Sequence, residues 1–456
     1  MRQRYLVVGI TAIAALWMYI DRVCISILAD PIKTDLGLTD QEKENALGAF
    51  FFTYALFQIP VGALADRFGP RLVLSLSIAA WSAVTAATGL AWSFFALLGF
   101  RLLLGVTEAG AYPAAAALVK RWARAEERGL FSSVVAFGGR VGGAFAPSLT
   151  GWLSVVLIGV VVIEATNPSG VNWRGVFVLY GAIGIAVAAL FWLCIRDHPP
   201  GSEKLLGSPE PSPIGEGPDR PDTSEWHALP PEPSPGEDHP PAMVARPVGF
   251  IGRLGLLISS RNMWMFGGLQ FCNNVSWAFL ITLLPSYLKD ANIPYDSRSY
   301  IQTGVLLAGC VGMFCGGFVT DYARRRYGPR WGRSTPIATM MAGCAVMCVV
   351  VSTSPGLWVA VAALALMALF QDLGIPSVWA FAQDVGGRNV GAALGWGNML
   401  GNFGAALSPR LLGEVRRAGG WEAAFALCAA CYVVAVACGL LLDASKPVEP
   451  ERTSPG

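Results

Sequence analysis

Charge is scarce in this sequence. Only 14% of its 456 residues are Asp, Glu, Lys or Arg, whereas a soluble globular protein usually has about 25%. The formal net charge of +2 excludes the strongly basic surface that nucleic-acid binding requires. Its three histidines, His198, His227 and His239, all fall in one hydrophilic stretch. Any proton chemistry in the apolar segments must therefore use carboxylates.

Cysteine and histidine also lack the arrangement of a metal or catalytic site. The ten cysteines lie mostly in apolar runs, and Cys344/Cys348 and Cys428/Cys431 have helical spacing. Buried thiols of this kind usually pack as small hydrophobic groups, so we predict no metal and no cofactor. An intramembrane serine protease would need a membrane histidine, and the G-x-G-D of the aspartyl type is absent. We therefore expect no enzyme.

Long apolar segments are what the sequence has instead. Its residues are 54% hydrophobic, and many runs exceed the length that crosses a hydrocarbon core of about 30 Å. We predict an all-α membrane protein with about 12 transmembrane helices in two six-helix bundles, the first beginning in an uncleaved N-terminal segment. The predicted spans are 5–29, 46–66, 70–90, 93–119, 129–153 and 173–195, then 263–288, 301–321, 336–354, 356–383, 388–413 and 421–442.

The two sets of spans are separated by a segment that cannot bury a core. Residues 197–247 are rich in Pro, Glu, Gly and Ser, a composition typical of disorder. The predicted domains are a bundle at 1–196, a disordered cytoplasmic linker at 197–250, a second bundle at 251–445 and a disordered tail at 446–456.

Charged loops predict the orientation of the chain. The loops at 66–71, 120–128 and 324–333 are basic, and the alternating loops at 91–93 and 353–356 carry no charge. The positive-inside rule places the basic loops and both termini in the cytoplasm.

A repeated loop indicates parallel halves. GALADRFGPR (62–71) and GGFVTDYARRRYGPR (316–330) both place G-x-x-x-D at the end of a second span. Halves related by an axis along the membrane normal are typical of alternating-access carriers. The alternative is a solvated charged turn, but the recurrence favours a latch on the cytoplasmic face. The gating candidates are Asp66, Arg67, Arg71 and Asp321.

Five charged residues lie deep inside the first set of spans. They are Asp21, Arg22, Arg101, Glu108 and Arg140. A charge at the centre of a bilayer costs roughly 2.5–3.5 kcal/mol on insertion scales, so these side chains must face each other or a wet cavity. The alternative is that these residues only form structural ion pairs. Three bases and two acids cannot all be paired in this way, so one positive charge is left over. This excess predicts an anionic substrate.

The second set of spans offers mainly neutral polar groups that suit hydroxyl recognition. Gln270 and Asn398 are candidates for ligand contact, whereas Asn273 and Asn402 fit interhelical packing equally well. Asp372 and Arg140 are membrane charges to which we assign no partner from the sequence.

With these residues in view, the chain resembles the major facilitator superfamily and, within it, the anion:cation symporter family. That family includes bacterial galactonate, glucarate, hexuronate and tartrate carriers and the vesicular glutamate and sialic acid transporters. The resemblance covers nearly the whole chain outside the linker. The matching motifs are Y-x-D-R at 19–22, YALFQIP at 54–60, GALADRFGPR at 62–71, RLLLGVTEAGAYP at 101–113, R-W-x(5)-R-G at 121–129 and LPSYL at 284–288.

The resemblance implies a role for each matching position. Arg22 and Arg101 would contact the substrate carboxylate, and Asp21 and Glu108 would bind and release the driving protons. Tyr19, Tyr54, Gln270, Trp379 and Asn398 would line a sugar-acid site. The expected protein is a monomeric, proton-coupled symporter of a small organic anion in the bacterial inner membrane.

Other readings stay open at this point. An organophosphate or other anion antiporter, or a drug exporter, would use the same fold, and sodium could replace the proton. A receptor would show binding without flux. The segment at 154–172, the long linker, Arg140 and Asp372 depart from the family pattern.

Overall fold

The chain is all-helical throughout the part that the structure describes. The computed structural model describes residues 2–157, 171–199, 249–353 and 356–449. Its helices are α1 (Arg2–Leu36), α2 (Asp40–Phe68), α3 (Pro70–Thr88), α4 (Phe94–Glu108), α5 (Ala111–Trp122), α6 (Arg128–Val156), α7 (Trp173–Cys194), α8 (Phe250–Ser259), α9 (Arg261–Thr282), α10 (Leu284–Asp290), α11 (Tyr295–Ser352), α12 (Leu357–Val385) and α13 (Val390–Leu441).

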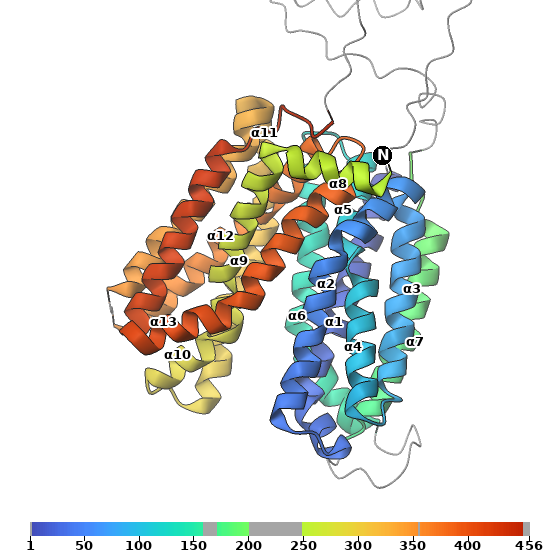
Figure 1. The fold of residues 1–456 in the computed structure, drawn as a ribbon, viewed down its shortest axis with the longest axis vertical. Coiled ribbons are helices and arrows are strands. Elements are labelled where there is room, and N and C mark those ends of the chain that lie inside the picture. The colour runs from blue at the N-terminus through green and yellow to red at the C-terminus, as the bar shows by residue number, and fades with distance from the viewer. Residues whose placement is uncertain (1, 158–170, 200–248, 354–355, 450–456) are drawn as a thin grey trace, which may run out of the picture.

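The helices form two bundles side by side. Helices α1–α7 make one bundle and α9–α13 the other, and the bundles approach each other at the end that holds the N-terminus and diverge toward the opposite end (Figure 1). We call the end with the N-terminus, Asp66 and Asp321 the latch end; the short helix α8 lies across it (Figure 1). The predicted all-α, two-bundle architecture is confirmed. Most of the predicted linker and tail lies outside the described residues, so the domain boundaries stay predictions.

Two very long helices each contain two membrane spans. Helix α11 has 58 residues and would be about 87 Å long if straight, nearly three times the hydrocarbon thickness. Its backbone breaks at Gly328, where φ is 72°, between the spans predicted at 301–321 and 336–354. Helix α13 breaks in the same way at Gly420, where φ is 74°. Glycine takes this left-handed conformation without the steric cost of a Cβ.

Counting these breaks recovers the expected number of spans. Nine helical segments in the described ranges are long and apolar enough to cross a membrane, α4 and α5 being taken together. The breaks in α11 and α13 raise the number to eleven. Helix α9, with 22 residues, is less hydrophobic because of Gln270, Asn273 and Asn274, and it supplies the twelfth.

The span predicted at 93–119 is divided rather than continuous. Helix α4 ends at Glu108, and α5 begins at Ala111. Pro113 lacks the N–H that would bond the carbonyl of Ala109, which weakens the helix at this point. The interruption therefore falls directly beside one of the deep carboxylates.

Close packing in the first bundle depends on glycines of α6. A Cβ on Gly142 would lie 2.1 Å from the carbonyl oxygen of Leu16, and one on Gly138 would lie 2.3 Å from that of Ala12. Each glycine thus sits against the backbone of α1, as small residues commonly do between membrane helices. This contact fixes the depth of Asp21 and Arg22 relative to α6.

The second bundle repeats this arrangement. A Cβ on Gly404 of α13 would lie 2.4 Å from the carbonyl oxygen of Phe271 of α9. Helices α9 and α13 therefore correspond to α1 and α6, in agreement with parallel halves.

Replacing Gly142 with Val should destabilise the first bundle. The new side chain meets the backbone of α1, and overpacking of this kind typically costs about 1–3 kcal/mol. We expect a lower unfolding temperature of the purified protein in detergent. Gly151→Val is the matched control, because Gly151 is in the same helix and has nothing within 4 Å of its Cβ position. Equal unfolding temperatures for the two variants would contradict this packing.

Candidate functional site

An arginine–glutamate pair forms the centre of the first bundle. Arg22 on α1 donates from Nε and Nη2 to Oε2 of Glu108 on α4, at 2.9 and 2.7 Å. Its guanidinium carbon lies 4.4 Å from the ring centroid of Tyr54 and 5.1 Å from that of Tyr19. Aromatic faces at these distances stabilise a cation. The structure therefore brings together four of the predicted site residues.

Arg101 and Asp21 lie beside this pair and are less completely bonded. Arg101 is 3% exposed, and its guanidinium carbon lies 4.9 Å from the ring of Phe50. Asp21 is 1% exposed, and neither of its carboxylate oxygens has a hydrogen-bond partner among the described residues. The buried indole N–H of Trp81 is close enough to interact with this carboxylate, but the two groups do not reach hydrogen-bond geometry. A buried carboxylate in this situation can gain from binding a proton or a cation.

The predicted residues of the second half lie on three different helices. Gln270 on α9 and Asn398 on α13 are half-buried. Trp379 on α12 is 5% exposed, and its ring contacts that of Tyr112 on α5, with centroids 4.9 Å apart. This aromatic contact joins the two bundles. The sequence analysis did not select Tyr112.

The two charges without an assigned partner pair with each other. Arg140 on α6 donates from Nη2 to Oδ1 of Asp372 on α12 at 2.5 Å, so the pair crosses from one bundle to the other. The guanidinium carbon of Arg140 also lies 5.2 Å from the ring of Trp277 on α9. Sequence spacing could not reveal this pair, because 232 positions separate its members.

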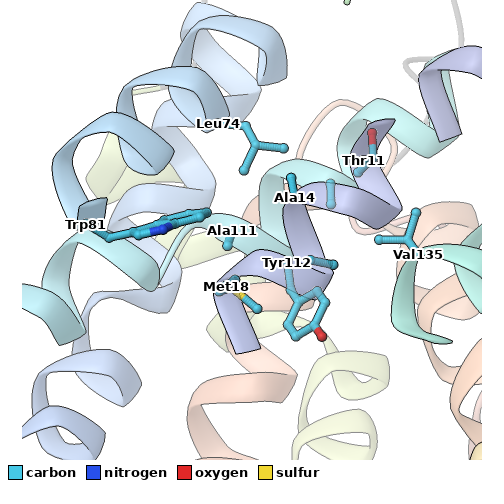
Figure 2. A pocket seen from close by; sticks show the side chains of 10 residues that line it. Thr11, Ala14, Met18, Leu74, Trp81, Ala111, Tyr112 and Val135 are labelled. Carbon is cyan, nitrogen blue, oxygen red and sulfur yellow. The ribbon is translucent and has the colours of Figure 1, made fainter. Parts of the chain in front are cut away.

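A small cavity lies inside the first bundle rather than between the bundles (Figure 2). It is lined by residues of α1, α3, α5 and α6, among them Met18, Trp81 and Tyr112. Its free volume of about 10 Å³ suits at most one water molecule. It is too small for an organic acid. No group of three His, Cys, Asp or Glu that could hold a metal occurs among the described residues.

Asp66 closes one side of the latch end. Its carboxylate oxygens accept hydrogen bonds from the backbone N–H groups of Gly391 and Ala392, at 2.8 and 2.9 Å. These are the first residues of α13, where the free N–H groups and the helix dipole favour a negative charge. Nη1 of Arg253 on α8 is 3.9 Å from the same carboxylate. The main partner of Asp66 is thus a helix end of the other bundle rather than the arginines of its own loop.

Asp321 makes the same contact in the opposite direction. It accepts from the backbone N–H groups of Gly129 and Leu130, both at 2.9 Å, at the start of α6. Each bundle therefore contributes an aspartate that caps a helix of the other. The positions of Asp66 and Asp321 agree with a latch, and their gating role stays a prediction.

The other two gating candidates contact residues of their own bundle. Arg71 donates to the carbonyl of Trp192 at 2.7 Å, and its backbone N–H bonds Asp197 at 3.0 Å. Arg67 lies over the ring of Phe68 at 5.0 Å. Neither arginine makes a hydrogen bond or ion pair with the described residues of the second bundle.

A second charged contact at the latch end was missed by the sequence analysis. Asp384 on α12 accepts from Arg333 on α11 at 2.7 Å and also from Arg128 on α6. Arg333 is fully buried and also donates to the carbonyl of Ala125 at 2.7 Å. In the sequence the basic loops at 120–128 and 324–333 indicate only orientation. Their arginines also bind the two bundles together.

Two helical bundles that are joined at one end and carry buried charges midway along their helices are an arrangement typical of membrane carriers. The comparisons assign the family: the Major Facilitator Superfamily model matches residues 11–409 and 326–456. The chain belongs to the major facilitator superfamily and is a membrane transporter.

Named relatives and a solved structure extend this assignment. A probable sulfoacetate transporter of Cupriavidus necator is 27% identical over 97% of this chain and 94% of its own length. The hexuronate transporter of Bacillus subtilis is 28% identical over 90% and 87%. A structure of the Escherichia coli fucose:proton symporter superposes with a TM-score of 0.69 at 15% identity, covering 95% of this chain and 98% of its own. The last similarity concerns the fold alone.

Replacing Asp66 with Asn should loosen the latch. The amide accepts more weakly than the carboxylate, and hydrogen bonds to charged groups contribute about 1.5–3 kcal/mol. We expect faster hydrogen–deuterium exchange, measured by mass spectrometry, at the start of α13 and also at the start of α6, because both close together. Asp30→Asn, which removes a charge from an exposed pair with Lys43, is the control. Unchanged exchange at both helix starts would show that Asp66 holds no latch.

Proposed function

We propose that the chain is a proton-coupled symporter of a small organic anion that works by alternating access. The observation that carries the proposal is the buried pair of Arg22 and Glu108 next to the unpartnered carboxylate of Asp21 and the buried Arg101. Arg22 and Arg101 can bind a carboxylate of the substrate, and Asp21 and Glu108 can bind the coupled protons. Both relatives named above are designated transporters of organic acids, which supports an organic anion.

Charge balance supports the coupling to protons. Six charged side chains lie deep in the spans: Arg22, Arg101, Arg140, Asp21, Glu108 and Asp372. The sequence analysis counted one base in excess in the first set of spans, but Asp372 of the second set pairs with Arg140, so bases and acids are equal in number. A bound anion therefore adds one uncompensated negative charge to the membrane interior. Such a charge costs roughly 2.5–3.5 kcal/mol on insertion scales, and one proton on a carboxylate removes it. We infer that anion and proton cross together.

The direction of opening follows from the charged loops. The basic loops at 66–71, 120–128 and 324–333 lie at the latch end, which the positive-inside rule assigns to the cytoplasm. The bundles diverge toward the other end (Figure 1), and Asp66, Asp321 and Asp384 join them at the latch end, so the arrangement corresponds to a carrier that is closed toward the cytoplasm. For a bacterial protein this is the inner membrane, with both termini cytoplasmic. A single chain contains both bundles, so a monomer suffices.

Uptake into proteoliposomes tests this function. We expect accumulation of at least one organic acid when the outside is more acidic than the inside. Arg101→Ala should lower uptake roughly 10- to 100-fold, as the loss of a charge-assisted hydrogen bond of about 1.5–3 kcal/mol implies. Arg410→Gln is the matched control, since the side chain of Arg410 is 83% exposed and, among the described residues, pairs only with nearby Glu414.

Glu108→Gln separates coupling from binding. The amide keeps the shape of the side chain but binds no proton in exchange for the substrate. We expect this variant to lose accumulation against a gradient while retaining exchange of labelled for unlabelled acid. Normal proton-driven accumulation in Glu108→Gln would remove Glu108 from the coupling role. Accumulation that follows a sodium gradient instead would assign sodium, and exchange without accumulation in the wild type would indicate an antiporter.

A further inference from the structure

The charge pair of Arg140 and Asp372 crosses the interface that a carrier must rearrange. Arg140 lies 12 residues after the start of α6 at Arg128, and Asp372 lies 13 residues before the end of α12 at Val385. At 1.5 Å per residue both are about 18–20 Å from the latch end, at the depth of Glu108. The pair therefore lies near the middle of the membrane, at the interface between the two bundles.

The internal repeat shows why this pair differs from the pair of Arg22 and Glu108. Glu108 begins E-A-G-A-Y-P, and Asp372 begins D-L-G-I-P; each acid is followed by a glycine two residues later and then by a proline. The two carboxylates thus take corresponding places in the two halves. Glu108 binds an arginine of its own bundle, whereas Asp372 binds an arginine of the other. When the bundles rock, the first pair can move as a unit and the second must find new partners.

Arg140 has donors to spare in this arrangement. Nη2 of Arg140 is the nitrogen that donates to Asp372. Nε and Nη1 do not belong to the buried nitrogen atoms that lack a partner, so they can donate to a ligand without first having been left unsatisfied. Its side chain is 18% exposed, against 7% for Asp372. Trp277 covers one side of the guanidinium, which orients its planar fork as recognition of an anion requires.

Tyr19 connects Arg140 with the predicted substrate arginines. Its ring lies beside Arg22, and the same ring fits against Gly139 and Gly143 of α6, where a Cβ would approach it to 2.9 and 3.2 Å. Arg140 directly follows Gly139 in α6, so it begins in the part of the helix that this tyrosine contacts. Tyr19 therefore contacts Arg22 on one side and the turn of α6 that carries Arg140 on the other.

We propose that Arg140 is a second anion-binding residue and that the substrate is an organic diacid, with one anionic group at Arg22 and Arg101 and the other at Arg140. Asp372 takes the place of the second group while the site is empty. This inference rests on the proposed function and narrows its substrate class. A dianion adds two negative charges, so two protons accompany it, one of them on the displaced Asp372. Both protons and the dianion leave together on the other side, and no charge is moved.

Binding to the purified full-length protein tests the proposal. The probes are two matched pairs of acids, gluconate with glucarate and butyrate with succinate, and apparent affinities come from ligand-dependent unfolding temperatures. The wild type should prefer at least one diacid to its matched monoacid. Arg140→Gln should lower that preference by about tenfold or more, the effect of losing one charge-assisted hydrogen bond. Asp372→Asn should strengthen diacid binding and reduce the protons taken up per dianion from two to one.

Further variants separate ligand binding from structural pairing. Arg410→Gln is the matched control. The double neutral variant Arg140→Gln/Asp372→Asn removes both charges, so it leaves no buried charge unpaired if Arg140→Gln alone fails to fold. The exchange Arg140→Asp/Asp372→Arg restores the pair but moves the base to the other bundle. Diacid preference should stay lost in both double variants.

The outcomes distinguish this inference from the proposed function. Full recovery of diacid preference in the exchanged variant, or an equal loss of monoacid and diacid binding in Arg140→Gln, would overturn the role of Arg140. A wild type that binds and transports monoacids but prefers no diacid would overturn the substrate class and leave the symporter intact. A wild type that neither binds nor transports any acid would overturn both.

Discussion

The pairing of charges inside the membrane is the constraint on which the rest of this protein depends. A charged group in the hydrocarbon region needs a partner or water, and six such groups lie deep in the spans described. Arg22 and Glu108 pair within one bundle, although Oε1 of Glu108 has no hydrogen-bond partner among the described residues, and Arg140 and Asp372 pair across the two bundles. Asp21 keeps a carboxylate without a hydrogen-bond partner. A proton or an anion can therefore act differently on the pair within one bundle, on the pair between the bundles and on the unbonded carboxylate of Asp21.

The two halves of the fold match each other in their backbone contacts but differ in the charged residues that they carry. Glycine contacts join α1 to α6 and α9 to α13 in the same way, and Asp66 and Asp321 cap helices of opposite bundles in the same way. The bases deep in the described spans, however, all belong to the first bundle. Asp372 must therefore take its partner from across the interface. In the proposed alternating-access cycle, backbone symmetry allows the bundles to rock, and the asymmetric charges make this motion depend on what is bound.

Several features were predictable because they depend on local pattern. Apolar runs predicted the twelve spans, and the depth of Asp21 and Glu108 followed from counting residues along a helix. The repeated G-x-x-x-D loop predicted corresponding positions for Asp66 and Asp321. The sequence analysis did not use the second repeat, in which the acids Glu108 and Asp372 are each followed by Gly and Pro. That repeat relates Asp372 to Glu108 by local pattern alone, although it does not identify the partner of either acid.

What the sequence by itself determined is which segments cross the membrane and which charges they carry, because hydrophobicity and helical rise act along a single segment. Only the tertiary structure decided the partners. Asp66 binds the backbone at the start of α13, Asp384 joins Arg128 to Arg333, and Arg140 meets Asp372. These contacts join residues 51 to 325 positions apart. Backbone amides have no signature in the sequence, and partner choice depends on how the two bundles face each other.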